Sequence, residues 1–110
     1  MALRKWRCVL CGDEVVEGQR FTVLRDGFVH LECLYEKLVR EGRVNPDIVA
    51  LMDAIEALNY LIVRVKEAKR LAESEELRNL LDAVRVDAEK HAAQLSALLE
   101  KRAGLAEGKS

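Results

Sequence analysis

Three cysteines and one histidine form two pairs of equal spacing, and this pattern restricts the fold more than any other feature of the chain. Cys8 and Cys11 are separated by two residues, and so are His30 and Cys33. These positions include every cysteine and one of the two histidines. Thiolate sulfur and imidazole nitrogen are the donors that tetrahedral Zn²⁺ binds, and two such pairs are typical of a zinc site. The pattern therefore predicts that Cys8, Cys11, His30 and Cys33 bind one Zn²⁺.

Other uses of these residues explain the pattern less well. A redox pair leaves His30 without a role, and a disulfide leaves one cysteine over and suits an oxidising compartment. Iron in place of zinc stays open, because spacing alone does not select the metal. We expect a structural site, since four protein ligands leave no position for a catalytic water. A segment of about 45 residues buries too little surface to fold alone, and zinc supplies on the order of 10 kcal/mol.

The first 45 residues predict a small α+β module around this site. Gly12, directly after Cys11, suits the left-handed conformation that a Cys-x-x-Cys turn needs. Residues 6–8 and 19–30 predict short strands, with Asp26-Gly27 as the positive-φ residues of a tight β-hairpin turn. Residues 31–42 predict a short helix that ends near Gly42, with an apolar stripe of Leu31, Leu34, Leu38 and Val39.

This order of elements resembles that of known zinc-binding families. The stretch "CVLCG", a β-hairpin, "HLEC" and a helix over residues 4–42 resemble a treble-clef zinc finger, with a spacing similar to the first zinc site of LIM domains. The same residues with a helical tail are also similar to a small archaeal family described only as a domain of unknown function. The resemblance implies zinc at the same four residues and implies no activity.

The chain changes character at Asn45-Pro46, which is a good helix start. Residues 47–103 contain no Gly and no Pro, and Ser74 offers a second helix start. We therefore expect an α+β zinc module over residues 1–45, an all-α antiparallel helical hairpin over 46–103, and a disordered tail over 104–110. Heptad seams of the coiled-coil type run along both helices. They comprise Ile48, Leu51, Ile55, Leu58, Ile62 and Val65 in the first helix, and Leu77, Leu81, Val84, Ala88, His91, Leu95 and Leu98 in the second.

More apolar side chains flank these seams than a two-helix hairpin covers. The surplus comprises Val49, Met52, Leu61, Ala68, Leu80, Ala92 and Leu99. It favours a homodimer with a four-helix bundle, and the alternative is packing against the zinc module itself. His91 lies on the second seam without metal-binding neighbours, so we expect it at the edge of a helix interface.

Charge and composition set limits on function. The net charge is -1, so there is no overall basic excess of the kind that indicates nucleic-acid binding. No segment has the length and hydropathy of a membrane span, so we expect a soluble, cytoplasmic protein without a membrane partner. Only five residues are Asn or Gln, which suits a thermophile and equally a GC-rich genome. No nucleophile set, phosphate loop or carboxylate pair indicates an enzyme.

Two functions remain. The first is a non-catalytic module that binds a protein partner through a zinc-stabilised head on a self-associating helical stalk. The alternative is nucleic-acid binding by the basic residues of the finger, which are Arg4, Lys5, Arg7, Arg20 and Arg25.

Overall fold

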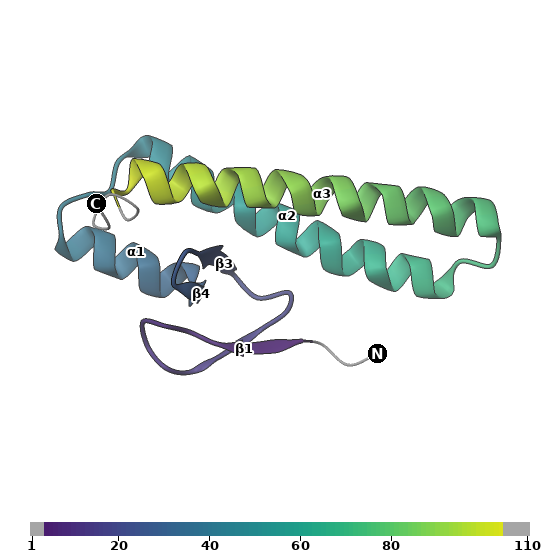
Figure 1. Cartoon of the computed structure of the whole chain (residues 1–110), viewed down its shortest axis with the longest axis horizontal. Coiled ribbons are helices and arrows are strands. Elements are labelled where there is room, and N and C mark those ends of the chain that lie inside the picture. The colour runs from purple at the N-terminus through teal and green to yellow at the C-terminus, as the bar shows by residue number, and fades with distance from the viewer. Residues whose placement is uncertain (1–3, 105–110) are drawn as a thin grey trace.

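The computed structural model describes residues 4–104 and has a small N-terminal head (residues 4–45) beside a long helical hairpin (Figure 1). The head holds strands β1 (Lys5–Arg7), β2 (Glu14–Val16), β3 (Phe21–Leu24) and β4 (Gly27–His30), followed by helix α1 (Leu31–Arg40). The helical hairpin consists of α2 (Pro46–Leu71) and α3 (Glu75–Arg102). The fold is therefore the expected one, a small zinc-finger-like α+β module followed by two long helices. Of the expected tail, only Gly104 lies within the described residues.

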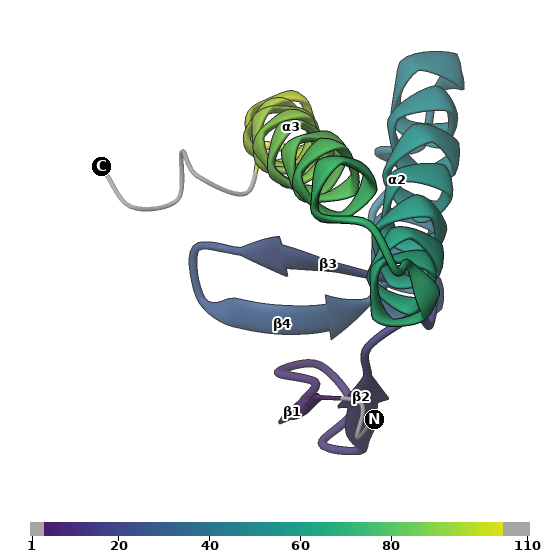
Figure 2. The ribbon, with the colours of Figure 1, turned by 90° about the vertical axis from the view of Figure 1, so that its right-hand side faces the viewer.

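The strands form two separate antiparallel sheets of two strands each (Figure 2). In the first sheet Trp6 lies opposite Val15, and in the second Thr22 lies opposite Val29. The second sheet is the expected β-hairpin, but the predicted conformation of its turn is wrong. Arg25 and Asp26 form the loop, and only Gly27, with φ of 135°, has a positive φ. A turn residue such as Asp26 adopts a positive φ only at a cost that Gly27, without a Cβ, avoids.

The starts of both long helices follow directly from local sequence. The Asn45 side chain accepts a hydrogen bond from the Ile48 N–H at 3.0 Å, and Pro46 occupies the first helical position. The Ser74 hydroxyl accepts one from the Leu77 N–H at 3.1 Å. Both caps satisfy amide groups that a helix start otherwise leaves unpaired. The predicted break between the two helices is confirmed.

One hydrophobic core extends through the head and into the helical hairpin. Val15, Val29, Leu34 and Leu38 of the head are fully or almost fully buried and belong to the same cluster as Leu99 of α3. Strand β3 contacts both α2 and α3. The head thus covers one side of the helical hairpin near the start of α2 and the end of α3. The division into two domains at residue 45 stays a prediction.

Polar contacts attach β3 and the turn that follows it to the two long helices. The Thr22 and Ser96 hydroxyls form a buried hydrogen bond. The Asn59 amide donates to the Phe21 carbonyl at 2.6 Å, and the Arg25 N–H donates to the Glu100 carboxylate at 2.7 Å. Backbone groups at a sheet edge otherwise offer pairing sites to other chains.

The predicted seam of the second helix is only partly correct. Ala88 is buried and Leu81 and Leu95 are half-buried, whereas the other four seam residues are exposed, namely Leu77, Val84, His91 and Leu98. The positions that α3 buries near its end are instead Ser96, Leu99 and the following Ala103. The reason is that α3 contacts β3 as well as α2, so its buried face turns toward the head. The prediction for α1 also fails at Val39, which is half exposed.

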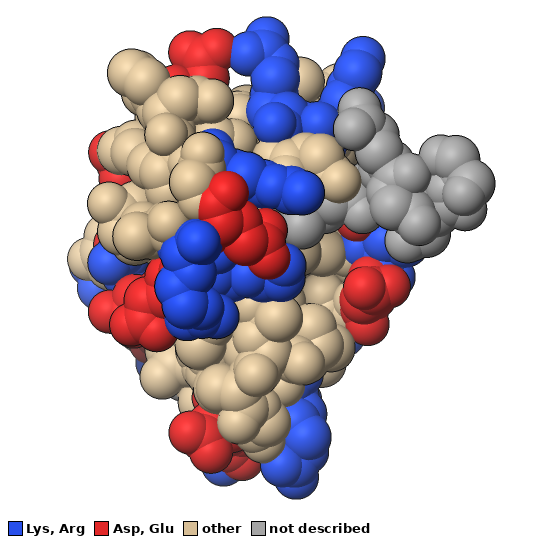
Figure 3. All heavy atoms as spheres, turned by 90° about the vertical axis from the view of Figure 1, so that its left-hand side faces the viewer, with Lys and Arg blue, Asp and Glu red and all other residues tan. Residues whose placement is uncertain are grey.

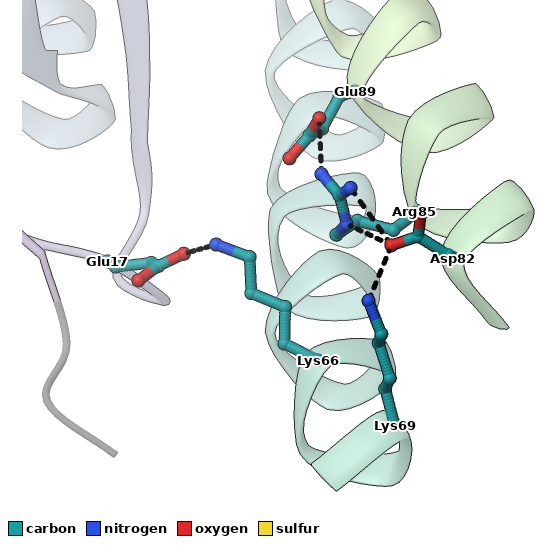
Figure 4. Close-up of polar contacts among 6 residues, drawn as sticks. All are labelled: Glu17, Lys66, Lys69, Asp82, Arg85 and Glu89. Atoms are coloured by element: carbon teal, nitrogen blue, oxygen red, sulfur yellow. Dashed lines mark hydrogen bonds and ion pairs between the residues drawn. The ribbon is translucent and has the colours of Figure 1, made fainter. Parts of the chain in front are cut away.

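An ion pair between Glu17 and Lys66 joins the head to the C-terminal part of α2 (Figure 4). The Glu17 side chain is only 9% exposed and also accepts a hydrogen bond from the Arg4 N–H at 3.2 Å. Burial raises the pKa of Glu17, but the Lys66 ammonium and the Arg4 N–H outweigh burial and hold the pKa below its usual range. The contact therefore depends on an ionised carboxylate.

Substitution Glu17→Gln should destabilise the protein by about 1–3 kcal/mol at neutral pH, because it removes the charged partner of Lys66. The lowered pKa stabilises the folded chain above the unfolded-state pKa, and this contribution is lost as the pH falls through the folded-state pKa. From about pH 7 down to about pH 3, the stability difference between wild type and variant should therefore stay constant until the pH nears about 4.3, the usual pKa of a Glu carboxyl, and shrink below it. Thermal unfolding of both proteins across that range measures it.

Glu14→Gln serves as the matched control for Glu17→Gln. Glu14 forms an ion pair with Lys5 at 3.9 Å in which both side chains are 60% exposed. An exposed pair of this kind contributes at most about 1 kcal/mol. If Glu14→Gln and Glu17→Gln cost the same, or if the Glu17 difference does not depend on pH, the proposed role of Glu17 is wrong.

A second ion-pair network joins α2 to α3 beyond the head (Figure 4). The Asp82 carboxylate accepts from Lys69 at 3.0 Å and from Arg85 at 3.0 Å, and Arg85 also pairs with Glu89 at 3.0 Å. Networks of this kind gain importance at high temperature. The inference of a thermophilic source stays a prediction.

Candidate metal centre

Three separate parts of the head supply the four candidate ligands. Cys8 and Cys11 lie in the loop between β1 and β2, His30 ends β4, and Cys33 lies in the first turn of α1. One ligand atom from each residue lies within 4.8 Å of those of the other three. The four residues that the spacing predicted are therefore brought together and could bind a metal ion.

The loop that carries Cys8 and Cys11 turns so that backbone amides point at sulfur. The Gly12 N–H donates to the Cys8 carbonyl at 2.9 Å, and Gly12 has a φ of 82°. The Leu10 N–H lies 3.4 Å from the Cys8 sulfur, and the Asp13 N–H lies 3.4 Å from the Cys11 sulfur. Amide donors of this kind stabilise negative charge on thiolates. The left-handed conformation expected at Gly12 is confirmed.

The two nitrogen atoms of the His30 imidazole contact different groups, one the cysteine sulfurs and the other a backbone carbonyl. Its Nδ1 lies 3.4 Å from the Cys11 sulfur and 3.6 Å from the Cys33 sulfur. Its Nε2 lies 2.9 Å from the Glu14 carbonyl oxygen, to which the Nε2–H donates. This arrangement leaves the lone pair on Nδ1 and orients the ring, as metal-binding histidines require.

These separations match the edges of a tetrahedral metal site. Bonds of about 2.3 Å to sulfur and about 2.0–2.1 Å to nitrogen, at tetrahedral angles, place sulfur and nitrogen about 3.6 Å apart. The observed separations of 3.4 and 3.6 Å lie close to that value. The donor set therefore fits one tetrahedral ion without a large rearrangement.

The sulfur atoms differ in how easily they ionise. Burial raises the pKa of the Cys8 thiol, but backbone N–H groups, including that of His30, outweigh burial and lower the pKa to about 6. Burial and the neighbouring Cys11 and Cys8 sulfurs raise the pKa of the Cys33 thiol to about 12. Three thiolates are therefore unfavourable together unless a cation is present. A divalent ion would leave a net charge of about -1 on the cluster.

The spacing of Cys8, Cys11 and Gly12 predicts a turn whose backbone N–H groups point at the first sulfur, and the contact from the Leu10 N–H to the Cys8 sulfur confirms it. The group that orients the His30 ring could not be predicted, because any residue type supplies a carbonyl such as that of Glu14. Strand β2, which holds Glu14, was also missed. Its three residues are too few for a recognisable alternating pattern.

The second histidine and the basic residues of the finger lie outside the cluster. His91 is exposed, with its Nδ1 3.1 Å from the Gln94 side-chain oxygen, so it does not lie in the interface between α2 and α3. Arg20 pairs with Glu56 at 2.9 Å, and the Arg7 guanidinium donates to the Gly12 carbonyl at 2.6 Å. At the end of the molecule where α1 ends, basic and acidic groups are interspersed (Figure 3). Nucleic-acid binding stays a prediction.

Fold and site together define a small α+β protein with a three-cysteine, one-histidine cluster, able to hold a metal ion, beside a helical hairpin. The chain belongs to the family described as "Uncharacterized protein conserved in archaea (DUF2175)", whose model matches residues 4–101. This agrees with the resemblance to a small archaeal family. The similarity to LIM domains stays a prediction. Comparisons with curated proteins and with solved structures gave no match. Between residues 4 and 104, no helix has the length and apolar character that crossing a membrane requires.

Proposed function

We propose that the chain is a non-catalytic zinc protein, in which one structural Zn²⁺ holds the head together and the helical hairpin serves as a protein-interaction module. The observation that carries the proposal is the convergence of Cys8, Cys11, His30 and Cys33 within 4.8 Å. A tetrahedral zinc ion would have all four positions filled by protein, which leaves none for a reacting water. The thiol ligands suit a reducing compartment such as the cytoplasm.

Zinc is favoured over iron by the mixed donor set. Imidazole with three thiolates is a common structural zinc site, and zinc undergoes no redox chemistry that would oxidise its ligands. Elemental analysis of protein purified without added metal tests the choice, with about one zinc per chain expected. Stoichiometric iron, with visible thiolate-to-iron absorption, would contradict it.

The interaction surface in this proposal is the side of the helical hairpin that faces away from the head. Its apolar side chains are all 37–62% exposed. At 3.6 residues per turn, the apolar side chains of α3 lie about 100–160° around the helix axis from Ser96, which contacts β3. This outer face is formed by Leu61 of α2 and by Leu77, Leu80, Val84 and Leu98 of α3. Of the surplus apolar residues, the head covers Met52 and Leu99 and leaves Leu61 and Leu80 exposed.

A homodimer that joins two outer faces would form the four-helix bundle. Light scattering after size exclusion at micromolar concentration should give twice the chain mass for the wild type. The double variant L80K/V84K should be a monomer with unchanged helix content, because both side chains are already solvent-exposed in one chain.

Val86→Lys is the matched control for that experiment. Val86 is 44% exposed on α3 but lies about 160° from Val84 around the helix axis, off the outer face. It should leave the dimer intact. A monomeric wild type, or a Val86→Lys variant that dissociates as readily as L80K/V84K, would contradict the proposed interface.

A further inference from the structure

A groove between α1 and α2 lies next to the metal centre. It has a volume of about 570 Å³, and Cys33 is among its lining residues. Its floor contains Leu31 and Met52, which are 1% and 4% exposed, and its walls carry the half-exposed Val49 and Tyr35. The groove therefore offers apolar contacts along the space between two helices.

Both walls of this α1–α2 groove carry carboxylates without basic partners. Glu32 and Glu36 come from α1, and Asp53 comes from α2. Within residues 4–104, none of the three has a basic nitrogen within 4.0 Å, although eleven other ion pairs form. The one basic residue of the groove, Arg20, is paired with Glu56 at 2.9 Å. The groove thus has an apolar floor and an uncompensated negative charge on both sides.

We propose that the α1–α2 groove binds a basic amphipathic helix of a partner protein, with its apolar edge on the floor and its Lys or Arg side chains against Glu32, Glu36 and Asp53. An amphipathic helix in an apolar groove is a common mode of peptide recognition. Carboxylates on both walls select a partner with basic residues on both flanks of its apolar edge. This inference rests on the proposed interaction function and names the class of partner.

One wall of the groove is connected directly to the candidate metal ligands. Helix α1 begins directly after His30 and carries Cys33 in its first turn. A metal ion bound to both residues would fix the start of α1, and with it Glu32, relative to the rest of the head. Removal of the metal should therefore weaken partner binding even though Glu32, Glu36 and Asp53 are unchanged.

The test uses a fluorescein-labelled helical peptide of about 14 residues, ~20 Å long, with leucines on one edge and arginines on both flanks. Fluorescence anisotropy with the metal-loaded chain should show saturable binding that weakens as salt increases. The variant E36K/D53K should bind at least about tenfold more weakly, because it replaces attraction with repulsion. The control E73K/E76K, which reverses two exposed carboxylates near the start of α3, should bind as the wild type does.

Three results would overturn the inference. The first is no binding at low salt, and the second is equal binding of a peptide with glutamates in place of the arginines. The third is a change of oligomeric state in E36K/D53K without a change in peptide affinity, which would make the groove a contact between copies of the chain. Metal content, measured separately by elemental analysis, tests the zinc proposal, so the two failures are distinguishable.

Discussion

His30→Ala is expected to lower the affinity of the chain for zinc by about 100-fold or more, because it removes one of four ligands and the only one that does not add negative charge. Since metal-binding energy contributes to the folding of such small modules, the head should lose stability in parallel. Competition with a chromophoric zinc chelator measures the affinity. Trp6, the only tryptophan, stacks on Phe28 with ring centroids 4.2 Å apart, so its fluorescence reports on the head.

The chain provides a matched control for this substitution. His91 is the only other histidine, and its ring lies exposed against Gln94, away from the cluster. His91→Ala should leave zinc affinity and Trp6 fluorescence unchanged. Chelation of zinc from the wild type should change Trp6 fluorescence as His30→Ala does, while the helical signal in circular dichroism falls less. Equal zinc affinity in the His30→Ala and wild-type chains would contradict the assigned ligand set.

Leu99→Ala should destabilise the protein by about 2–5 kcal/mol, the usual cost of a large-to-small change in a close-packed core. Leu99 is completely buried in the cluster that joins α3 to the head, so its truncation leaves a cavity at the contact between the two parts. Urea unfolding followed by circular dichroism measures the change. The effect should not depend on protein concentration, because the contact lies within one chain.

Substitution of the neighbouring residue, Leu98, provides a comparison for Leu99→Ala. Leu98 is 37% exposed on the outer face, so within a single chain Leu98→Ala should cost no more than about 1 kcal/mol. Any further cost should grow with protein concentration, as expected for a residue in a dimer interface. A larger intrinsic effect at Leu98 than at Leu99 would mean that the heptad pattern, rather than the observed packing, describes α3.

Features that depend on neighbouring residues could be predicted from the sequence. The caps at Asn45 and Ser74 and the left-handed Gly12 require only local geometry. The metal cluster could be predicted although its halves are far apart, since few functions need cysteine and histidine at that spacing. Tertiary contacts were harder to predict from the sequence. The periodicity of α3 indicates an apolar face but does not indicate that β3 would cover part of it, and so favoured Leu98 over Leu99.

The shared core of head and helical hairpin has a consequence for newly made chains. If the head requires a bound metal ion to fold, as proposed, a chain without the ion would leave one side of α2 and α3 uncovered, and buried side chains such as Met52 and Leu99 would become accessible to water. Apolar surface of this kind is what chaperones and proteases recognise in incompletely folded proteins. The abundance of the protein would then follow the supply of metal in the cell, without any dedicated regulator.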